Sequence, residues 1–194
     1  AEPNITIHEG DALKEDFNGL TEPLRKRGGY KDGFVVVANL PYYITTPLMM
    51  RFLEAGFLWR RQVLMVQKEV AQRVLAKAGS KDYGALSLAV QYRAKAELAF
   101  NVPPTVFYPK PKVNSAVLVL ERLAEPPVRV QDEKWFFAVI KAAFGQRRKT
   151  LNNALAGGLG LAKTGVAAAL AKAGIDGSRR GETLSIEEFA ALAD

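Results

Sequence analysis

Residues 34–43 read F-V-V-V-A-N-L-P-Y-Y, an uninterrupted apolar run that ends in an amide, a proline and two aromatic rings. A β-branched run without polar alternation predicts a strand that is buried on both faces, as in the centre of a parallel sheet. Ligands of such sheets bind beyond the carboxyl ends of the strands. Residues 39–43 are therefore a candidate pocket for a flat, polar group, and an ordinary strand-to-helix turn is the alternative.

Strands and helices alternate around this run. The other apolar runs that predict strands are 5–8, 63–66, 95–101 and 115–122. The helical patterns between them start at Thr45 or Thr46, at Lys68 and at Gly84. This order predicts an α/β fold in which helices cover a mostly parallel sheet.

The sequence after the linker-like A-E-P-P-V predicts helices only. Apolar residues recur at helical spacing over 135–144, and the alanine-rich stretch 164–173 ends before a glycine. We therefore expect two domains, an α/β domain at 1–123 and a small all-helical domain at 124–194.

Two shorter patterns in this helical part have a local interpretation. Ser185 and Glu188 have the spacing of a capping box that opens the last helix. The glycine-rich stretch 157–165 lacks both the preceding strand and the Gly-Lys pair of a phosphate-binding loop. We interpret it as a loop between helices.

The composition of the 194 residues limits the classes of function. A net charge of +7 favours a polyanionic partner such as nucleic acid. Without cysteine, and with His8 as the only histidine, we expect no disulfide and no metal site. No apolar run approaches the roughly 20 residues of a membrane span, so we expect no membrane partner and a cytoplasmic protein.

The turn after the first apolar run has the groups that an exocyclic amine requires. The Asn39 side-chain oxygen and a backbone carbonyl beside Pro41 can accept both hydrogens of an amine such as adenine N6, which turns its lone pair toward an electrophile. Tyr42 can stack on the base. Asp11 also follows a predicted strand, and its carboxylate can either bind an adenine amino group or cap a helix.

Basic side chains gather in short stretches, for which phosphate contact and an ordinary solvated face are the alternatives. The candidates for phosphate contact are Arg147, Arg148 and Lys149, then Arg179 and Arg180, and Lys110 with Lys112.

Five motifs, in order along the chain, resemble the ribosomal RNA adenine dimethyltransferases, especially the bacterial enzymes of the small-subunit 16S RNA. They are N-L-P-Y-Y-I-T-T-P, V-Q-K-E-V-A-Q-R with K-D-Y-G-A-L-S, F-Y-P-K-P-K-V-N-S, Q-R-R-K-T-L and R-G-E-T-L-S. The resemblance implies dimethylation of N6 of two adjacent adenosines in a hairpin loop near the 3′ end of 16S RNA, during small-subunit biogenesis. It also implies S-adenosylmethionine as the methyl donor and a Rossmann-like class I methyltransferase sheet.

Site residues follow from the same resemblance. Asn39 and Pro41 hold the target amine, Tyr42 stacks on the adenine, and Phe107 closes the pocket from another side. For the cofactor, the resemblance implies contacts from Asp11, Asn39 and Leu40. The helical domain is implied to bind RNA.

One departure concerns the start of the family's sequence pattern. The family begins with a strand and a glycine-rich loop that hold the cofactor, and neither motif occurs in these residues. We expect a truncated methyltransferase sheet and weak or absent cofactor binding by the given chain, and hence no methyl transfer. Two alternatives to the 16S function are a 23S RNA adenine methyltransferase of the macrolide-resistance type and a non-catalytic RNA-binding assembly factor.

Overall fold

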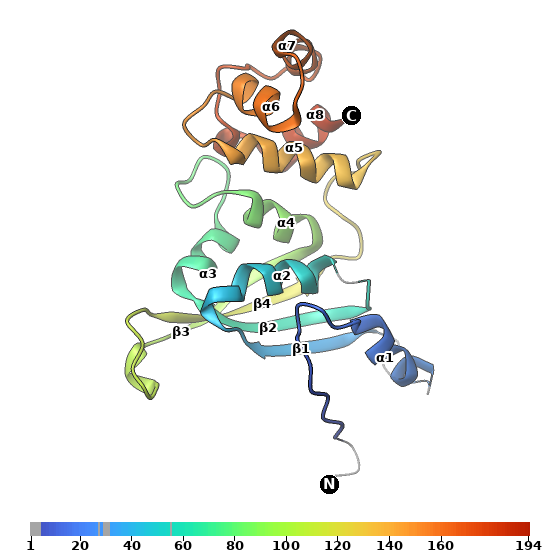
Figure 1. The fold of residues 1–194 in the computed structure, drawn as a ribbon, viewed down its shortest axis with the longest axis vertical. Coiled ribbons are helices and arrows are strands. Elements are labelled where there is room, and N and C mark those ends of the chain that lie inside the picture. The colour runs from blue at the N-terminus through green and yellow to red at the C-terminus, as the bar shows by residue number, and fades with distance from the viewer. Residues whose placement is uncertain (1–4, 27, 29–31, 55) are drawn as a thin grey trace.

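The computed structural model describes residues 5–26, 28, 32–54 and 56–194, and its centre is a four-stranded sheet of order β1-β2-β4-β3 (Figure 1). The strands are β1 (Phe34–Asn39), β2 (Trp59–Gln67), β3 (Ala94–Val102) and β4 (Ser115–Arg122). The expected α/β class is confirmed. The expected mostly parallel sheet is wrong for the described strands, because only β1 and β2 pair in parallel. A loop without an α-helix joins β3 to β4, and strands connected in that way pair antiparallel.

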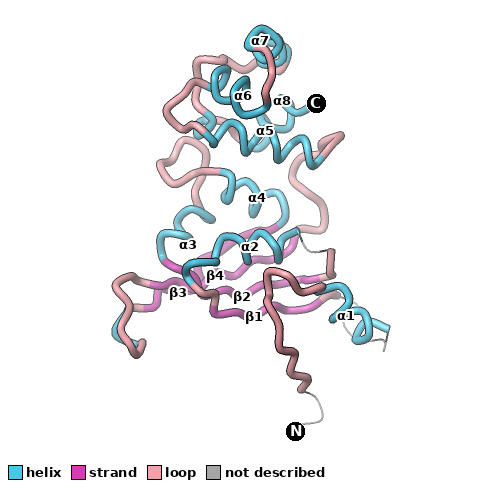
Figure 2. The backbone as a smooth tube through the Cα atoms, viewed as in Figure 1, coloured by secondary structure: helices cyan, strands magenta, loops and turns pink. Residues whose placement is uncertain are grey.

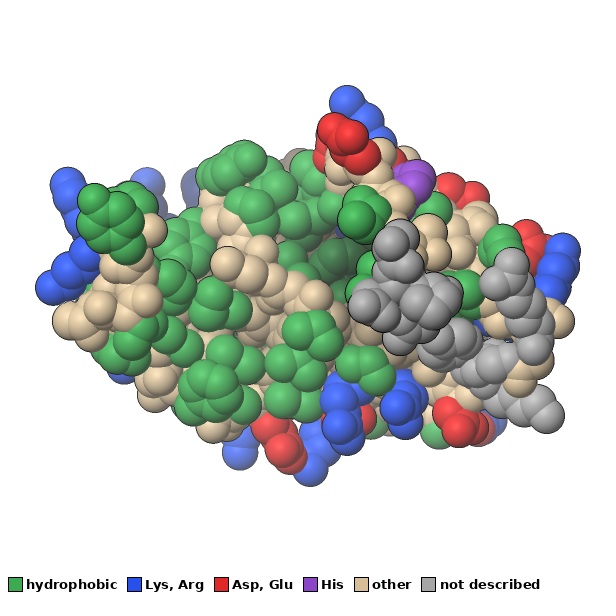
Figure 3. Space-filling view, turned by 90° about the horizontal axis from the view of Figure 1, so that it is seen from below, with side chains coloured by type: hydrophobic (Ala, Val, Ile, Leu, Met, Phe, Trp, Pro, Cys, Tyr) green, Lys and Arg blue, Asp and Glu red, His purple; other side chains and the backbone are tan. Residues whose placement is uncertain are grey.

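β1 lies at an edge of this sheet, not at its centre as its sequence predicts. The side chains of Val35 and Val37 are 43% and 75% exposed. Hydrophobic side chains gather on this helix-free face of the sheet (Figure 3). The strand expected at 5–8 is also wrong: these residues form no regular structure, since no described strand lies beside them to pair with.

Helices cover the other face of the sheet (Figure 2). The helices of this part are α1 (Phe17–Lys26), α2 (Thr45–Glu54), α3 (Lys68–Leu75) and α4 (Ala85–Arg93). The apolar stripe of α2, with Met49 fully buried, packs in one core with Leu64 of β2 and Leu118 of β4. The helix therefore holds the turn that precedes it against the end of the sheet.

The remainder of the chain is helical, as predicted. Its helices are α5 (Glu133–Gly145), α6 (Leu151–Leu159), α7 (Lys163–Lys172) and α8 (Ile186–Ala193). The predicted capping box is confirmed, because the Ser185 hydroxyl accepts a hydrogen bond from Glu188 N–H and the Glu188 carboxylate accepts one from Ser185 N–H. No helix in the described part of the chain is long and apolar enough to cross a membrane.

α4 belongs to both cores of the molecule. Its Leu88 and Tyr92 pack with the core of α5 to α8, whereas Val90 and the following Ala94 pack with the core of the sheet. The helical part is therefore seated on the sheet part through a shared helix. The division at residue 124 remains a prediction.

The glycine-rich stretch 157–165 is not the loop that its composition predicts. Gly157 and Gly158 lie inside α6, and Gly160 ends that helix with a φ of 67°. A Cβ atom on Gly158 would lie 2.6 Å from Ala142 Cβ and 2.9 Å from Ala142 Cα. Gly158 is required because α6 approaches the backbone of α5 closely at this point.

Replacing Gly158 with Ala should destabilise the protein by about 1–3 kcal/mol, because the new methyl group overlaps Ala142. The matched control is Gly157→Ala in the same helix, where an added Cβ meets only the Gln146 side chain, at 3.5 Å. That change should stabilise the helix by roughly 0.5–1 kcal/mol. Thermal unfolding of the two variants measures both effects, and equal shifts in Tm would contradict the close approach.

Candidate functional site

The chain leaves β1 through a turn that is fixed by backbone hydrogen bonds. Leu40 is 3% exposed, and its N–H donates to the Met65 carbonyl of β2 at 3.1 Å. A 3-10 turn, Tyr42–Ile44, then leads directly into α2. The Pro41 carbonyl accepts from Ile44 N–H at 3.1 Å and from the buried Thr45 hydroxyl at 3.0 Å. Residues 39–45 therefore hold one shape between a sheet and a helix.

This shape leaves two acceptors free next to each other. The Pro41 carbonyl is already used by two donors, whereas no described residue donates to the Leu40 carbonyl. The Asn39 side chain is exposed at the end of β1 and has no hydrogen-bond partner among the described residues. An exocyclic amine has two hydrogens, so the Asn39 side-chain oxygen and the Leu40 carbonyl are the candidate acceptors for both. That Pro41 itself holds the amine remains a prediction.

Tyr42 is anchored at its hydroxyl. That hydroxyl lies 2.5 Å from the Ser115 hydroxyl, 73 residues further along the chain, at the start of β4. Ser115 is fully buried, so the bond fixes where the half-buried Tyr42 ring can lie. The next ring, Tyr43, is 86% exposed and makes no such bond among the described residues. Ser115 was missed by sequence reasoning, although it ends the quoted motif F-Y-P-K-P-K-V-N-S.

The loop between β3 and β4 projects from the same end of the molecule as this turn (Figure 1). It carries Phe107, which is half-buried, and the exposed Lys110 and Lys112. The loop returns to the sheet at Ser115, which binds Tyr42. Phe107 therefore lies in the loop that leads into Ser115, the residue bonded to Tyr42. Its contact with a bound base remains a prediction.

Asp11 closes a turn and caps no helix. Its carboxylate accepts from Leu13 N–H at 3.0 Å, and α1 begins only at Phe17. The capping bond that sequence reasoning offered for Asp11 belongs to Asp16, which accepts from Asn18 N–H at 3.0 Å. The second Asp11 oxygen lies 3.5 Å from Lys14 Nζ, and the side chain is 51% exposed. Asp11 can therefore still accept a bond from a ligand.

A cavity of about 800 Å³ lies elsewhere, at the amino end of β2. Trp59, Arg93 and Arg122 are among its lining residues. Trp59 starts the strand whose other end, at Met65, pairs with Asn39. The cavity is therefore at the opposite end of the sheet from the turn. Among the described residues, no group of three or more acidic or histidine side chains could hold a metal ion.

Comparison with known proteins finds related sequences and structures. A family model described as ribosomal RNA adenine dimethylase matches residues 1–194. The chain belongs to this dimethylase family. The ribosomal RNA small subunit methyltransferase A of Moorella thermoacetica is 52% identical over 98% of this chain and 66% of its own length. The protein of the same name from Desulfitobacterium hafniense is 58% identical over 98% of this chain and 65% of its own length.

The chain thus spans slightly less than two thirds of the length of these relatives. Solved structures show the same fold. A dimethyladenosine transferase from Plasmodium falciparum superposes with a TM-score of 0.77 at 24% identity, over 98% of this chain and 71% of that chain. The 23S rRNA methyltransferase ErmE superposes with a TM-score of 0.63 at 24% identity and the same coverage. The expected methyltransferase fold is confirmed.

The basic residues chosen from the sequence fall into two groups, according to whether they bind other residues of the chain. Two of them, Arg147 and Arg179, bind other residues of this chain through their guanidinium groups. The others are exposed and have no ion-pair partner among the described residues. They are Lys110, Lys112, Arg148, Lys149 and Arg180.

Arg147 connects three segments that are distant in sequence. Its Nη2 donates to the Lys81 carbonyl at 2.7 Å and to the Tyr83 carbonyl at 3.2 Å. Its Nε lies 3.8 Å from a carboxylate oxygen of Glu182. The motifs K-D-Y-G-A-L-S, Q-R-R-K-T-L and R-G-E-T-L-S therefore meet at one guanidinium group.

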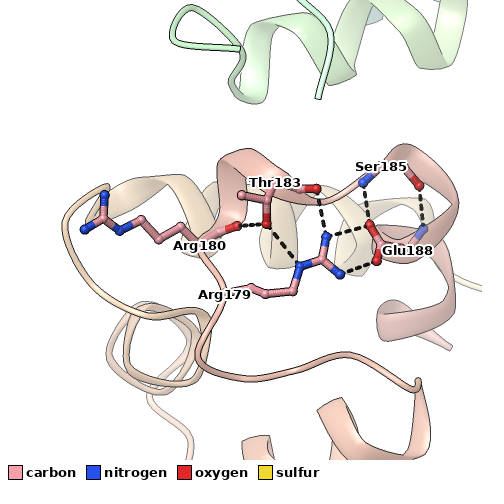
Figure 4. A network of polar contacts seen from close by, with 5 residues as sticks. All are labelled: Arg179, Arg180, Thr183, Ser185 and Glu188. Carbon is pink, nitrogen blue, oxygen red and sulfur yellow. Dashed lines mark hydrogen bonds and ion pairs between the residues drawn. The ribbon is translucent and has the colours of Figure 1, made fainter. Parts of the chain in front are cut away.

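Arg179 forms a second closed network, with Thr183 and Glu188 (Figure 4). Its Nη1 and Nη2 bind the two oxygens of Glu188, the second at 3.1 Å. Its Nη2 also donates to the Thr183 carbonyl at 2.8 Å, and its Nε to the Thr183 hydroxyl at 3.1 Å. The hydrogen bond from Arg179 lowers the pKa of the Glu188 carboxyl against a weaker opposing effect of burial. The side chain of Arg180, by contrast, points away from this network, and only its carbonyl accepts a bond, from the Thr183 hydroxyl at 2.8 Å (Figure 4).

Removing the anchor of Tyr42 should loosen its ring. Ser115→Ala and Tyr42→Phe each remove the same hydrogen bond, and each should lower stability by about 0.5–1.5 kcal/mol. The double variant should lose no more than the larger single loss, since one bond is shared. Tyr43→Phe is the matched control and should change nothing, because its hydroxyl is exposed. Urea unfolding measures all four, and additive losses would contradict the bond.

Acid should weaken the Arg179–Glu188 pair. The folded-state pKa of Glu188 is below its ordinary value of 4.5, so the pair stabilises the protein above about pH 4.5 and is lost as the pH falls through the lowered pKa. Glu188→Gln should therefore be less stable than wild type at pH 7, and the difference should shrink toward pH 3. Glu187→Gln, a change in the same turn without an ion pair, should have little effect at pH 7. Tm measured against pH checks this, and a constant difference would contradict it.

Proposed function

We propose that the protein carrying this chain transfers methyl groups to N6 of two adjacent adenosines in a hairpin loop near the 3′ end of 16S ribosomal RNA. The observation that carries the proposal is the turn after β1, where two free acceptors adjoin an anchored aromatic ring. Family membership and relatives named small subunit methyltransferase A support the same reaction. The setting would be the assembly of the small ribosomal subunit in the cytoplasm.

The chain's own residues position the amine. The Asn39 side-chain oxygen and the Leu40 carbonyl accept its two hydrogens, which draws the lone pair out of conjugation with the ring. Tyr42 stacks on the base, with its ring held by Ser115. Phe107 covers the base from the β3–β4 loop. The gain in rate comes mainly from holding the nitrogen in line with its electrophile.

S-adenosylmethionine supplies that electrophile, a methyl group on a sulfonium, when it is bound. Asp11 retains a carboxylate oxygen that fits an adenine amino group, and Asn39 and Leu40 are the further residues that would hold the cofactor. The methylated nitrogen becomes a cation that releases a proton to solvent, so the site needs no strong base. Because each adenosine receives two methyl groups, the turn must accept the monomethylated amine again.

RNA binding is assigned to the exposed cations. Arg148, Lys149 and Arg180 from the helical part, and Lys110 with Lys112 beside the turn, can each contact a phosphate. For Arg147 and Arg179 a phosphate contact remains a prediction, and the bonds they make point to holding the neighbouring segments in place.

Two alternatives remain testable. A 23S RNA methyltransferase would use the same turn on another RNA; the relatives about 50% identical to this chain are named for the small subunit, which favours 16S RNA. A non-catalytic assembly factor would keep the basic surface without needing the acceptors. Primer extension across both ribosomal RNAs, in cells lacking the gene, separates the three. Dimethyladenosines that persist in 16S RNA would overturn the proposal.

Asn39→Ala in the whole protein should lower the rate of methyl transfer by on the order of 100-fold, because the amine loses one of its two positioning bonds. The Kd for RNA should stay unchanged, since the exposed cations are intact. Asn101→Ala, which removes an exposed amide from β3, is the matched control and should keep full activity. Radiolabelled methyl incorporation into 16S RNA measures the rate, and full activity of Asn39→Ala would contradict the role of the turn.

A further inference from the structure

We propose that the loop between α3 and α4, residues 76–84, forms the middle of the RNA-binding surface, with Lys77 and Lys81 as phosphate contacts. This inference rests on the proposed RNA substrate. Neither lysine belongs to the set that sequence reasoning selected, and both are exposed without an ion-pair partner among the described residues.

The loop is exposed but not free to move as a unit. Three hydrogen bonds dock it on the helical part: two run from Arg147 to the Lys81 and Tyr83 carbonyls, and Gly79 N–H donates to the Glu182 carbonyl at 2.7 Å. The buried Tyr83 ring packs edge-on against Phe144 at 5.9 Å. All three bonds use backbone groups of the loop, so the lysine side chains remain available.

Docking brings the loop beside the cations of two other segments. Arg147, which holds the loop, directly precedes Arg148 and Lys149, and Leu151 N–H donates to the Arg179 carbonyl at 2.7 Å, next to Arg180. The five exposed cations Lys77, Lys81, Arg148, Lys149 and Arg180 are here called the basic junction.

Few carboxylates oppose the basic junction. Glu182 lies within ion-pair distance of Arg147, at 3.8 Å. Asp82 is exposed and unpaired among the described residues. Glu187 is exposed too, without an ion-pair partner among the described residues, and it lines one cavity with Lys77. Five cations against these two unpaired carboxylates still favour a polyanion, and flexible ammonium groups suit phosphates that are read without regard to base sequence.

The loop also lies between the proposed catalytic turn and the helical part. α3 starts where Lys68 N–H donates to the Asn114 carbonyl at 2.9 Å, next to Ser115 and its bond to Tyr42. α3 has eight residues, is about 12 Å long and ends at the loop. In Figure 1 the β3–β4 loop, the start of α2, the α3–α4 loop and the end of α5 all lie on the left side of the molecule, in this order from bottom to top.

One RNA molecule can therefore follow this side from Lys110 and Lys112, past the anchored Tyr42, to the basic junction. Without Lys77 and Lys81, the middle of that path would have few cations. Because Arg147 holds the loop, contacts made by the helical part and by the sheet part are kept at a fixed separation, which would set where the target base meets the turn.

The test compares double variants of the whole protein in binding to a transcript of 16S RNA at several salt concentrations. Lys77→Ala with Lys81→Ala should weaken binding and lower the slope of log K against log[salt] by roughly 1.4 to 1.8, at about 0.7 to 0.9 per phosphate contact. Lys163→Ala with Lys172→Ala removes the same charge from exposed positions of α7 and should leave the slope unchanged.

A third pair separates this inference from the proposed function. If Arg148→Ala with Lys149→Ala lowers the slope but the loop pair behaves like the α7 pair, the role of the loop is overturned and RNA binding stands. If no pair changes the slope, RNA binding by this surface is overturned as a whole.

Arg147→Lys keeps the charge but loses the fork that holds the loop, so it should speed hydrogen exchange of the Gly79 amide and shrink the effect of the loop pair. Unchanged exchange would overturn the docking.

Discussion

The organisation of the candidate active site follows from the residue at which the ladder between β1 and β2 stops. The parallel ladder between β1 and β2 ends with the bond from Leu40 N–H to the Met65 carbonyl. The chain then enters the 3-10 turn and α2, and the Pro41 carbonyl accepts from Ile44 N–H and from the Thr45 hydroxyl. The Leu40 carbonyl follows the last bond of the ladder and precedes the helical residues, so neither element supplies a donor to it. A buried residue thus presents a fixed acceptor, without a donor among the described residues, next to Asn39.

The second constraint is that the two cores share α4 and are joined again by Arg147. Because the Arg147 side chain binds backbone carbonyls of the α3–α4 loop, it holds the loop whatever side chains the loop carries. The backbone positions from which the exposed cations extend are therefore fixed relative to the turn. In the proposed reaction, that rigidity lets an RNA held through its phosphates deliver one particular base to Tyr42.

The parts of the structure that sequence predicted well are those decided by local patterns. The helical repeat of α5, the capping box at Ser185 and the apolar run of β2 all form as expected. The central position of β1 and the strand at 5–8 failed because strand pairing depends on neighbours that a local pattern cannot supply. Gly158 was assigned to a loop because only the approach of Ala142 reveals why a glycine is needed in a helix. For the site, Asn39 and Tyr42 could be chosen from one pentapeptide, whereas Ser115 could not. Adjacent arginines such as Arg179 and Arg180 have opposite surroundings that composition does not distinguish.

The two acceptors of the turn also differ in a way that bears on a second methyl transfer. A monomethylated amine keeps one hydrogen, so only one acceptor can still be satisfied. The Leu40 carbonyl is immobilised, because the N–H of the same residue is bonded to Met65 and its side chain is buried. The Asn39 side chain is exposed and without a partner among the described residues, so it can rotate away. In the proposed reaction the remaining hydrogen would therefore stay on the Leu40 carbonyl while Asn39 makes room for the methyl group. In the proposed reaction, this difference between the two acceptors would let one turn accept the amine for both transfers.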